Sequence, residues 1–173
     1  TVNDLTTNDT TPQITGTYSD SHISTITLKV NGKDYSSTID TTTSTWSVDI
    51  TDELLDGTYP LEVTAVDMAG NTSSSTGTLV IDITAPSKVL GLHIISNTGI
   101  DLGCEGYTNN RNIKIDWDDN TETDLDHYIL DIKDKDGHKD NIIVSFYNAQ
   151  MRDIDGYYKY KIRAVDKLGN IGQ

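Results

Sequence analysis

The sequence predicts an all-β protein made of two tandem antiparallel β-sandwiches. Three observations predict it: apolar and polar residues alternate with period two in short runs, turn residues separate these runs, and one block of sequence occurs twice. Period-two alternation is typical of strands that are buried on one face. Several short strands in each half of a 173-residue chain, with turns at regular spacing, imply an antiparallel sandwich in each half.

In the first half, the alternating runs are rich in β-branched and aromatic residues, which favour strands. We expect strands at 25–30, 46–50, 59–65 and 78–81. Turn signals separate them at Asn31-Gly32, Asp56-Gly57 and Gly70-Asn71.

The second half shows the same alternation. We expect strands at 113–117, 128–132 and 158–164, and a hairpin turn at Asp136-Gly137. No stretch has a sustained helical period.

An internal repeat relates the two halves. Asp56-Gly57-Thr58-Tyr59 and the following block 65–71 (AVDMAGN) recur as Asp155-Gly156-Tyr157-Tyr158 and block 164–170 (AVDKLGN), both at an offset of 99 residues. Two blocks at one offset predict that the halves share a topology.

A change in composition places the domain boundary at Asp82 to Pro86. Residues 1–84 carry 2 basic and 12 acidic residues, whereas residues 85–173 carry 11 and 15. Pro86 also forces an extended conformation on the residue before it. We expect a domain at 10–84, a second at 85–173 whose last strand is truncated, and residues 1–9 as the end of a preceding module or a linker.

The net charge of −14 limits the partners. It argues against nucleic acid and anionic membranes, which bind through neutralised phosphates, and no apolar run is long enough for a membrane span. The only cysteine, Cys104, excludes an internal disulfide. We expect a monomer whose partners are neighbouring modules of the same chain.

The first domain contains a set of short motifs: 12–17 (PQITGT), 30–33 (VNGK), 46–48 (WSV), 56–59, 65–71 and the exit 81–86 (IDITAP). Through these motifs it resembles the bacterial Ig-like repeats of large surface adhesins. The second domain resembles a fibronectin type III module, through Pro86, Leu92, Trp117, Tyr128, a corner tyrosine at Tyr158, and block 164–166. It departs from that family in the long segment His93–Asn110.

The resemblance implies a non-catalytic spacer and adhesive scaffold in an extracellular or bacterial cell-surface protein, often with calcium at the module junctions. A surface glycan or a protein is the partner that such modules imply. Two alternatives stay open: accessory modules of a secreted hydrolase, or a carbohydrate- or peptide-binding second module that uses His93–Asn110 as its recognition loop.

Calcium is the candidate cofactor, because hard cations bind carboxylate and carbonyl oxygens and the acidic residues cluster at predicted loops. Asp67, Asn71 and Asp82, with Asp20 as a weaker addition, are the candidate ligands at the junction. The alternative for Asp67 and Asn71 is an Asx turn, in which the side chain binds nearby backbone.

A second acidic segment, 118–126, offers Asp118, Asp119 and Asp124 as weaker candidate ligands. Its spacing matches no known calcium loop, and a solvated loop is the alternative. The Asp134-Gly137 segment fails the EF-hand pattern, because the twelfth position falls on Ile143.

Other chemistry finds less support. No nucleophile, zinc or phosphate-loop motif is present, and Lys29 alternates toward solvent, which disfavours an isopeptide bond to it. The tyrosines Tyr18, Tyr107, Tyr147 and Tyr157 are the candidates for an aromatic binding surface.

Overall fold

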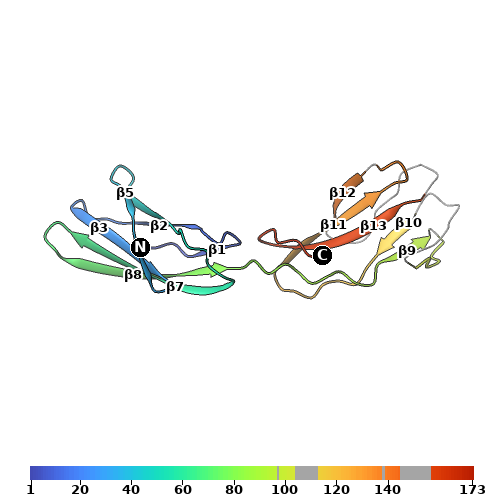
Figure 1. The fold of residues 1–173 in the computed structure, drawn as a ribbon, viewed down its shortest axis with the longest axis horizontal. Coiled ribbons are helices and arrows are strands. Elements are labelled where there is room, and N and C mark those ends of the chain that lie inside the picture. Colours follow the sequence, from blue (N-terminus) through green and yellow to red (C-terminus); the bar gives the residue numbers. More distant parts are fainter. Residues whose placement is uncertain (97, 104–112, 138, 145–156) are drawn as a thin grey trace. The chain divides into compact units, whose positions relative to one another are not determined.

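A computed structural model describes residues 1–96, 98–103, 113–137, 139–144 and 157–173 (Figure 1). The chain divides into two compact units, Thr1–Thr84 and Ala85–Gln173. The described residues form strands and turns and contain no helix, so the prediction of an all-β fold is confirmed. None of the described residues belongs to a helix that could cross a bilayer.

Unit 1 consists of two sheets that pack face to face. The larger has the order β1 (Leu5–Thr7), β8 (Thr72–Ile81), β7 (Gly57–Asp67), β3 (Ile23–Val30) and β4 (Lys33–Ser36). The smaller has the order β2 (Gln13–Thr17), β6 (Thr45–Asp49) and β5 (Thr38–Asp40). Neighbouring strands are antiparallel except β1 and β8, which are parallel.

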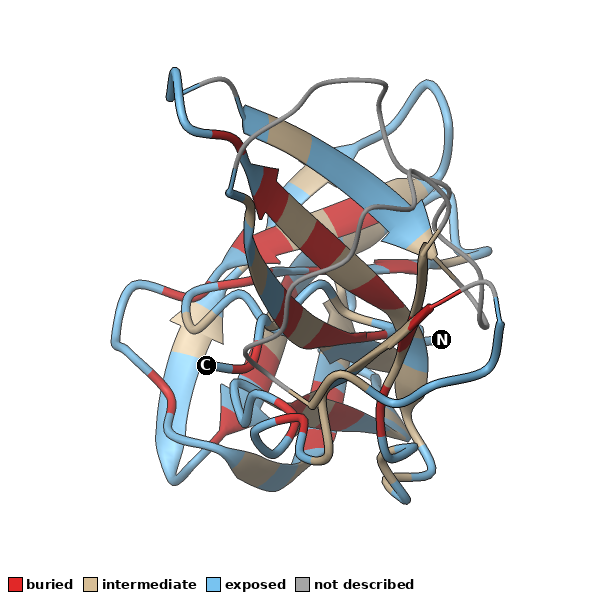
Figure 2. Ribbon diagram, turned by 90° about the vertical axis from the view of Figure 1, so that its right-hand side faces the viewer, coloured by how far each residue is buried: buried red, intermediate tan, exposed pale blue. Residues whose placement is uncertain are grey.

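The alternation in the sequence becomes the two faces of the strands in both units. Figure 2 shows it for unit 2, which faces the viewer there: buried and less buried residues alternate along its strands. Leu28, Val63 and Trp46 point into the core, and their neighbours face solvent. One cluster fills the space between the sheets; its buried members are Ile14, Ile26, Leu28, Val30, Trp46, Val48, Ile50, Leu54, Leu61, Val63, Leu79 and Ile81.

Residues 1–9 belong to unit 1, whereas they were expected to be the end of a preceding module or a linker. Val2 forms an antiparallel bridge with Gly16, and β1 then pairs with β8. The segment therefore crosses from the smaller sheet to the larger. It escaped prediction because its one strand is three residues long and shows no alternation that could be recognised.

Unit 2 also contains two antiparallel sheets. One pairs β9 (His93–Ser96) with β10 (Ile113–Asp116), and the other has the order β12 (Lys139–Val144), β11 (Leu125–Lys133) and β13 (Lys159–Asp166). Trp117 follows β10 directly and meets Tyr128 edge-on, with ring centroids 5.3 Å apart. The buried core is Val89, Ile115, Trp117, Tyr128, Leu130, Ile132, Ile162 and Ala164.

The segment His93–Asn110 was expected to be a loop, but part of it is a strand. Its first residues form β9, and Ser96 then donates its backbone N–H to the Ile100 carbonyl at 2.8 Å to turn the chain. Residues 104–110, with Cys104 and Tyr107, lie outside the described residues, as do Tyr147 and the repeated pair Asp155-Gly156.

Candidate functional site

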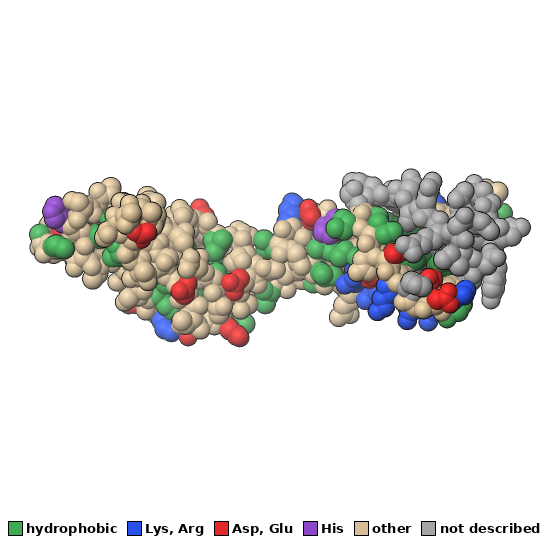
Figure 3. Space-filling model, turned by 90° about the horizontal axis from the view of Figure 1, so that it is seen from above, with side chains coloured by type: hydrophobic (Ala, Val, Ile, Leu, Met, Phe, Trp, Pro, Cys, Tyr) green, Lys and Arg blue, Asp and Glu red, His purple; other side chains and the backbone are tan. Residues whose placement is uncertain are grey.

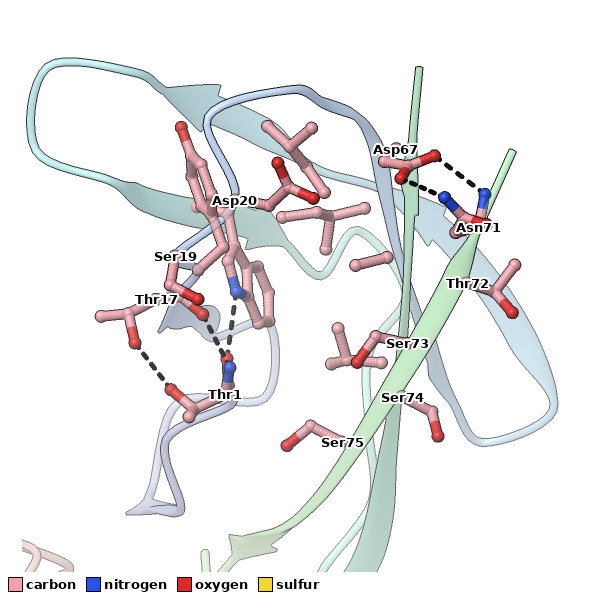
Figure 4. Close-up of a pocket in the computed structure, with 16 residues that line it drawn as sticks. Thr1, Thr17, Ser19, Asp20, Asp67, Asn71, Thr72, Ser73, Ser74 and Ser75 are labelled. Carbon is pink, nitrogen blue, oxygen red and sulfur yellow. Dashed lines mark hydrogen bonds between the residues drawn. The ribbon is translucent and has the colours of Figure 1, made fainter. Parts of the chain in front are cut away.

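Asp67 closes the turn between β7 and β8. Its Oδ1 accepts the backbone N–H groups of Ala69 and Asn71, both at 2.8 Å, and its Oδ2 accepts the Asn71 side-chain amide at 2.7 Å (Figure 4). The Asn71 amide, followed by these backbone donors, lowers the pKa of Asp67 below its usual value. This is the geometry of the Asx turn that the sequence left as the alternative to calcium.

The repeat reproduces this turn in unit 2. Asp166 Oδ1 accepts the backbone N–H groups of Leu168 and Asn170 at 2.9 and 2.8 Å, and its Oδ2 accepts the Asn170 amide at 2.7 Å. In both turns the glycine before the asparagine has a positive φ, 87° for Gly70 and 89° for Gly169, which glycine adopts without strain. The two turns differ in burial, since Asp166 is only 2% exposed.

The structure does not bring Asp67 and Asn71 to Asp82. Asp67 ends β7 and Asn71 precedes β8, whereas Asp82 follows the far end of the same ten-residue strand. At about 3.3 Å per residue the strand separates them by roughly 30 Å. Asp67 and Asn71 lie at the start of β8 and Asp82 lies at its other end, so the three residues cannot bind one ion.

The end of unit 1 where the linker leaves is held by acidic side chains. Asp82 Oδ1 accepts the backbone N–H of Thr84 at 3.1 Å. Asp56 Oδ2 accepts the Thr84 hydroxyl at 2.7 Å and the Ile83 N–H at 3.1 Å, and these two donors lower the pKa of Asp56, the hydroxyl most. The last residues of unit 1 are thus fixed before the chain reaches Pro86.

The end of unit 2 where the linker enters is also acidic. Glu122 Oε1 accepts the Ser87 backbone N–H at 2.8 Å, and Ser87, through its side chain and then its backbone, is the main cause that lowers the pKa of Glu122 to about 2. Asn120 donates its side-chain amide to the Ser87 carbonyl at 2.8 Å. The acidic loop therefore packs on the first residues of unit 2.

Two carboxylates meet at this entry end. Asp124 accepts the Lys167 N–H on its backbone carbonyl at 2.9 Å, and its carboxylate lies within 4.8 Å of that of Asp166. Two carboxylates this close repel each other unless a cation or solvent neutralises them. Asp166 was not predicted as a candidate ligand, although its identity with Asp67 in the repeat was a usable signal.

Asp118 and Asp119 have surroundings that differ from those of Asp124 and Asp166. The Asp118 carboxylate packs against Gly91, where an added Cβ would approach it to 2.3 Å, and its backbone N–H binds the Leu90 carbonyl at 3.0 Å. Asp119 is exposed. Of the three weaker candidates, Asp124 lies beside another carboxylate, that of Asp166.

The remaining sequence candidates are distributed as follows. Tyr18 is half-buried in unit 1 and donates its hydroxyl to the Asp40 carbonyl at 3.2 Å, Asp20 accepts the His22 N–H at 2.7 Å, and Tyr157 is 63% exposed in unit 2. Lys29 faces solvent. Lys33 forms an ion pair with Asp52. Tyr35 also donates its hydroxyl to the Asp52 carboxylate, at 3.0 Å. Both contacts lower the pKa of Asp52, and the one with Lys33 lowers it most.

Charge divides unevenly between the units. Figure 3 shows Lys and Arg side chains gathered on the visible face of unit 2, whereas few of them appear on the visible face of unit 1. Unit 1 has only two basic residues in its whole length. The field of unit 1 is therefore strongly negative and attracts cations.

Comparison with known families bears on unit 1. Residues 1–83 match the family model of the bacterial Ig-like domain. The match includes residues 1–9, in agreement with their place in the sheets, and it agrees with the resemblance inferred from the motifs. No curated protein matches the chain.

Three solved structures resemble the chain at low identity. One is a Ca²⁺-stabilised adhesin by which an Antarctic bacterium binds ice: 21% identity, TM-score 0.48, with 99% of this chain and 46% of the other covered. The second is dimeric latent PorU of Porphyromonas gingivalis, with 16% identity, a TM-score of 0.38, and 100% of this chain and 18% of the other covered. The third is SGBP-B of the Bacteroides ovatus mixed-linkage glucan utilization locus, in complex with a heptasaccharide. It has 12% identity and a TM-score of 0.31, and the match covers 98% of this chain and 62% of the other. The chain spans less than two thirds of each.

Proposed function

We propose that the two units are non-catalytic spacer modules of a larger bacterial cell-surface or secreted protein, in which they act as an adhesive scaffold. The match of residues 1–83 to the bacterial Ig-like domain carries this proposal. The function is mechanical: each sandwich is held by its own core, and the linker sets the spacing and direction of what the modules present.

Unit 2 is, in this proposal, a fibronectin type III-like module. The packing of Trp117 against Tyr128 supports it, as does burial of both side chains, at 5% and 2% exposed. Burial also raises the pKa of Tyr128. These aromatic residues anchor the unit at positions where the sequence resembles that family.

We further propose that calcium stiffens the linker by binding carboxylates at the two linker ends. Asp82 follows the last strand of unit 1, and Asp124 and Asp166 stand at the entry end of unit 2. Calcium takes six to eight oxygen ligands, including carboxylates and backbone carbonyls. The Asp67 and Asn71 turn lies at the far end of unit 1 and has no part in this site.

Thermal melts of the 173-residue chain in EDTA and in millimolar calcium test the proposal. An ion that binds only the folded state at 100 times its Kd adds about 2.7 kcal/mol, which corresponds to roughly 10 °C or more for domains of this size. Asp82→Asn and Asp124→Asn should each remove most of this shift.

Asp20→Asn is the matched control, because it removes an equal charge from an exposed loop of unit 1 away from Asp82. Magnesium and sodium chloride at matched ionic strength separate specific binding from screening. An equal rise in Tm in all three variants, or in sodium chloride alone, contradicts a calcium site at the linker.

A further inference from the structure

The strand β8 has one edge that is only partly paired. On one side it pairs with β7 from Thr72 to Ile81, but on the other side β1 covers only Leu79–Ile81. Upstream of β1 the chain leaves for the smaller sheet. Within the described chain, no strand pairs with Thr72–Gly77 on that side.

Two observations show which backbone groups point to this free edge. Thr78 donates its N–H to Asp4 Oδ1 at 2.7 Å, on the β1 side. Thr78 also stands opposite Pro60 of β7, which has no N–H to give. Since alternate residues of a strand point their N–H and C=O groups to the same edge, those of Thr72, Ser74 and Thr76 face the free edge as well.

A groove of about 510 Å³ opens between the sheets beside this edge (Figure 4). Its floor includes the buried side chains of Trp46, Ile26 and Val63, and Ser73 and Ser75 of β8 line one wall. The inward side chains of a strand added to β8 would project into this groove, as those of β1 pack on the core further along.

The chain already uses this mode of binding at the other half of the edge. An added Cβ at Gly77 would meet Val2 at 2.9 Å and Asp4 at 3.1 Å, and one at Gly16 would meet the Thr1 carbonyl at 2.1 Å. Glycines thus make room where the segment Thr1–Asp4 crosses from sheet to sheet. The Asp4 carboxylate caps Thr78 there, and the edge beyond Thr78 is left without such a cover.

Charge selects the occupant of the free edge. The charged side chains that line the groove are Asp20 and Asp67, and the lining described contains no Lys or Arg. A second copy of this chain would bring a net charge of −14 to a negative surface, which disfavours it.

We propose that the edge of β8 at Thr72–Thr76 is a docking site for an extended peptide segment that carries lysine or arginine and adds to the larger sheet as a sixth strand. Its backbone pairs with Thr72, Ser74 and Thr76. Its apolar side chains enter the groove, and its cationic side chains face the acidic rim.

The test uses two labelled eight-residue peptides, one alternating valine with lysine and one alternating valine with glutamate. Fluorescence anisotropy with the 173-residue chain should show saturable binding of the lysine peptide, at least ~10-fold tighter than the glutamate peptide, and weaker in high salt. Amide hydrogen exchange at Ser74 and Thr76 should slow when the lysine peptide is bound.

Ser74→Pro removes one edge N–H without removing a bond to β7, and it should weaken binding at least ~10-fold. Ser36→Pro on β4 is the matched control: Ser37 donates inward to the Ile26 carbonyl, so the N–H of Ser36 faces outward at the opposite edge of the same sheet. This variant should bind normally. Asp20→Asn, which keeps an acceptor for His22, gives a second readout if Ser74→Pro does not fold.

The proposal is overturned by no binding at millimolar peptide, by equal affinity for both peptides, by equal loss in Ser36→Pro, or by unchanged exchange at Ser74 and Thr76 in the bound state. Dimerisation of the chain alone, with these two amides protected, would assign the edge to a second copy and equally overturns it.

Discussion

The two Asx turns make a paired prediction, because they share their geometry and differ in burial. Asp166→Ala removes the acceptor for two backbone N–H groups and the Asn170 amide, at a residue that is 2% exposed. Each buried donor left without a partner costs about 1–3 kcal/mol. We therefore expect the variant to lower the free energy of unfolding of unit 2 by about 3 kcal/mol.

Asp67→Ala removes the same three hydrogen bonds from unit 1, but water can replace them because this turn is exposed. The loss of stability there should be clearly smaller. In unit 2 a loss of about 3 kcal/mol corresponds to a fall in Tm of roughly 12 °C or more.

The assay is a urea titration in EDTA, so that calcium adds nothing, followed by hydrogen exchange in β13 for unit 2 and in β7 for unit 1. Each strand reports its own unit within the full chain. Equal losses in the two variants, or a larger loss for Asp67→Ala, would mean that burial does not decide how much stability each turn contributes.

Three further predictions concern packing, pH and covalent chemistry. Gly16→Ala should destabilise unit 1 by about 1–3 kcal/mol in urea, because its Cβ would meet the Thr1 carbonyl and the Trp46 ring; an unchanged midpoint would mean that residues 1–4 do not hold this position. The pKa of Glu122 in the folded chain is about 2, below its unfolded value, so the stability that Glu122 contributes is present above about pH 4.3 and is lost as the pH falls toward 2. In Glu122→Gln the melting temperature should depend less on pH in that window, and an unchanged pH profile contradicts this. Lys33 and Asp52 should not form an isopeptide bond, because Asp52 keeps its charge in an exposed ion pair and the reaction needs a neutral amine and a neutral carboxyl group. The mass of the intact chain should therefore show no loss of water.

The strands could be predicted because each buries one face and so imposes period two on its residues. Ile26, Leu28 and Val30 in β3, and Tyr128, Leu130 and Ile132 in β11, are such positions. β1 and β9 could not, because β1 is only three residues long and the two apolar residues of β9 are adjacent, so that it shows no alternation. Their pairing depends on neighbours distant in the sequence.

The sequence grouped candidate ligands that the structure does not bring together. The sequence identified Asp67 and Asn71 as a turn and Asp82 as part of the linker. Grouping them ignored that a strand of ten residues separates them. The repeat could have corrected this, since it equates Asp67 with Asp166, the residue that stands at the entry end of unit 2 beside Asp124.

Amide ¹⁵N relaxation of the 173-residue chain measures whether calcium stiffens the linker between the two scaffold modules. In EDTA the two units should tumble with separate, short correlation times. In calcium both should rise to the single value of a rigid 19.0 kDa body, and Asp82→Asn should abolish the change. Correlation times that stay separate in saturating calcium would contradict a linker that calcium stiffens.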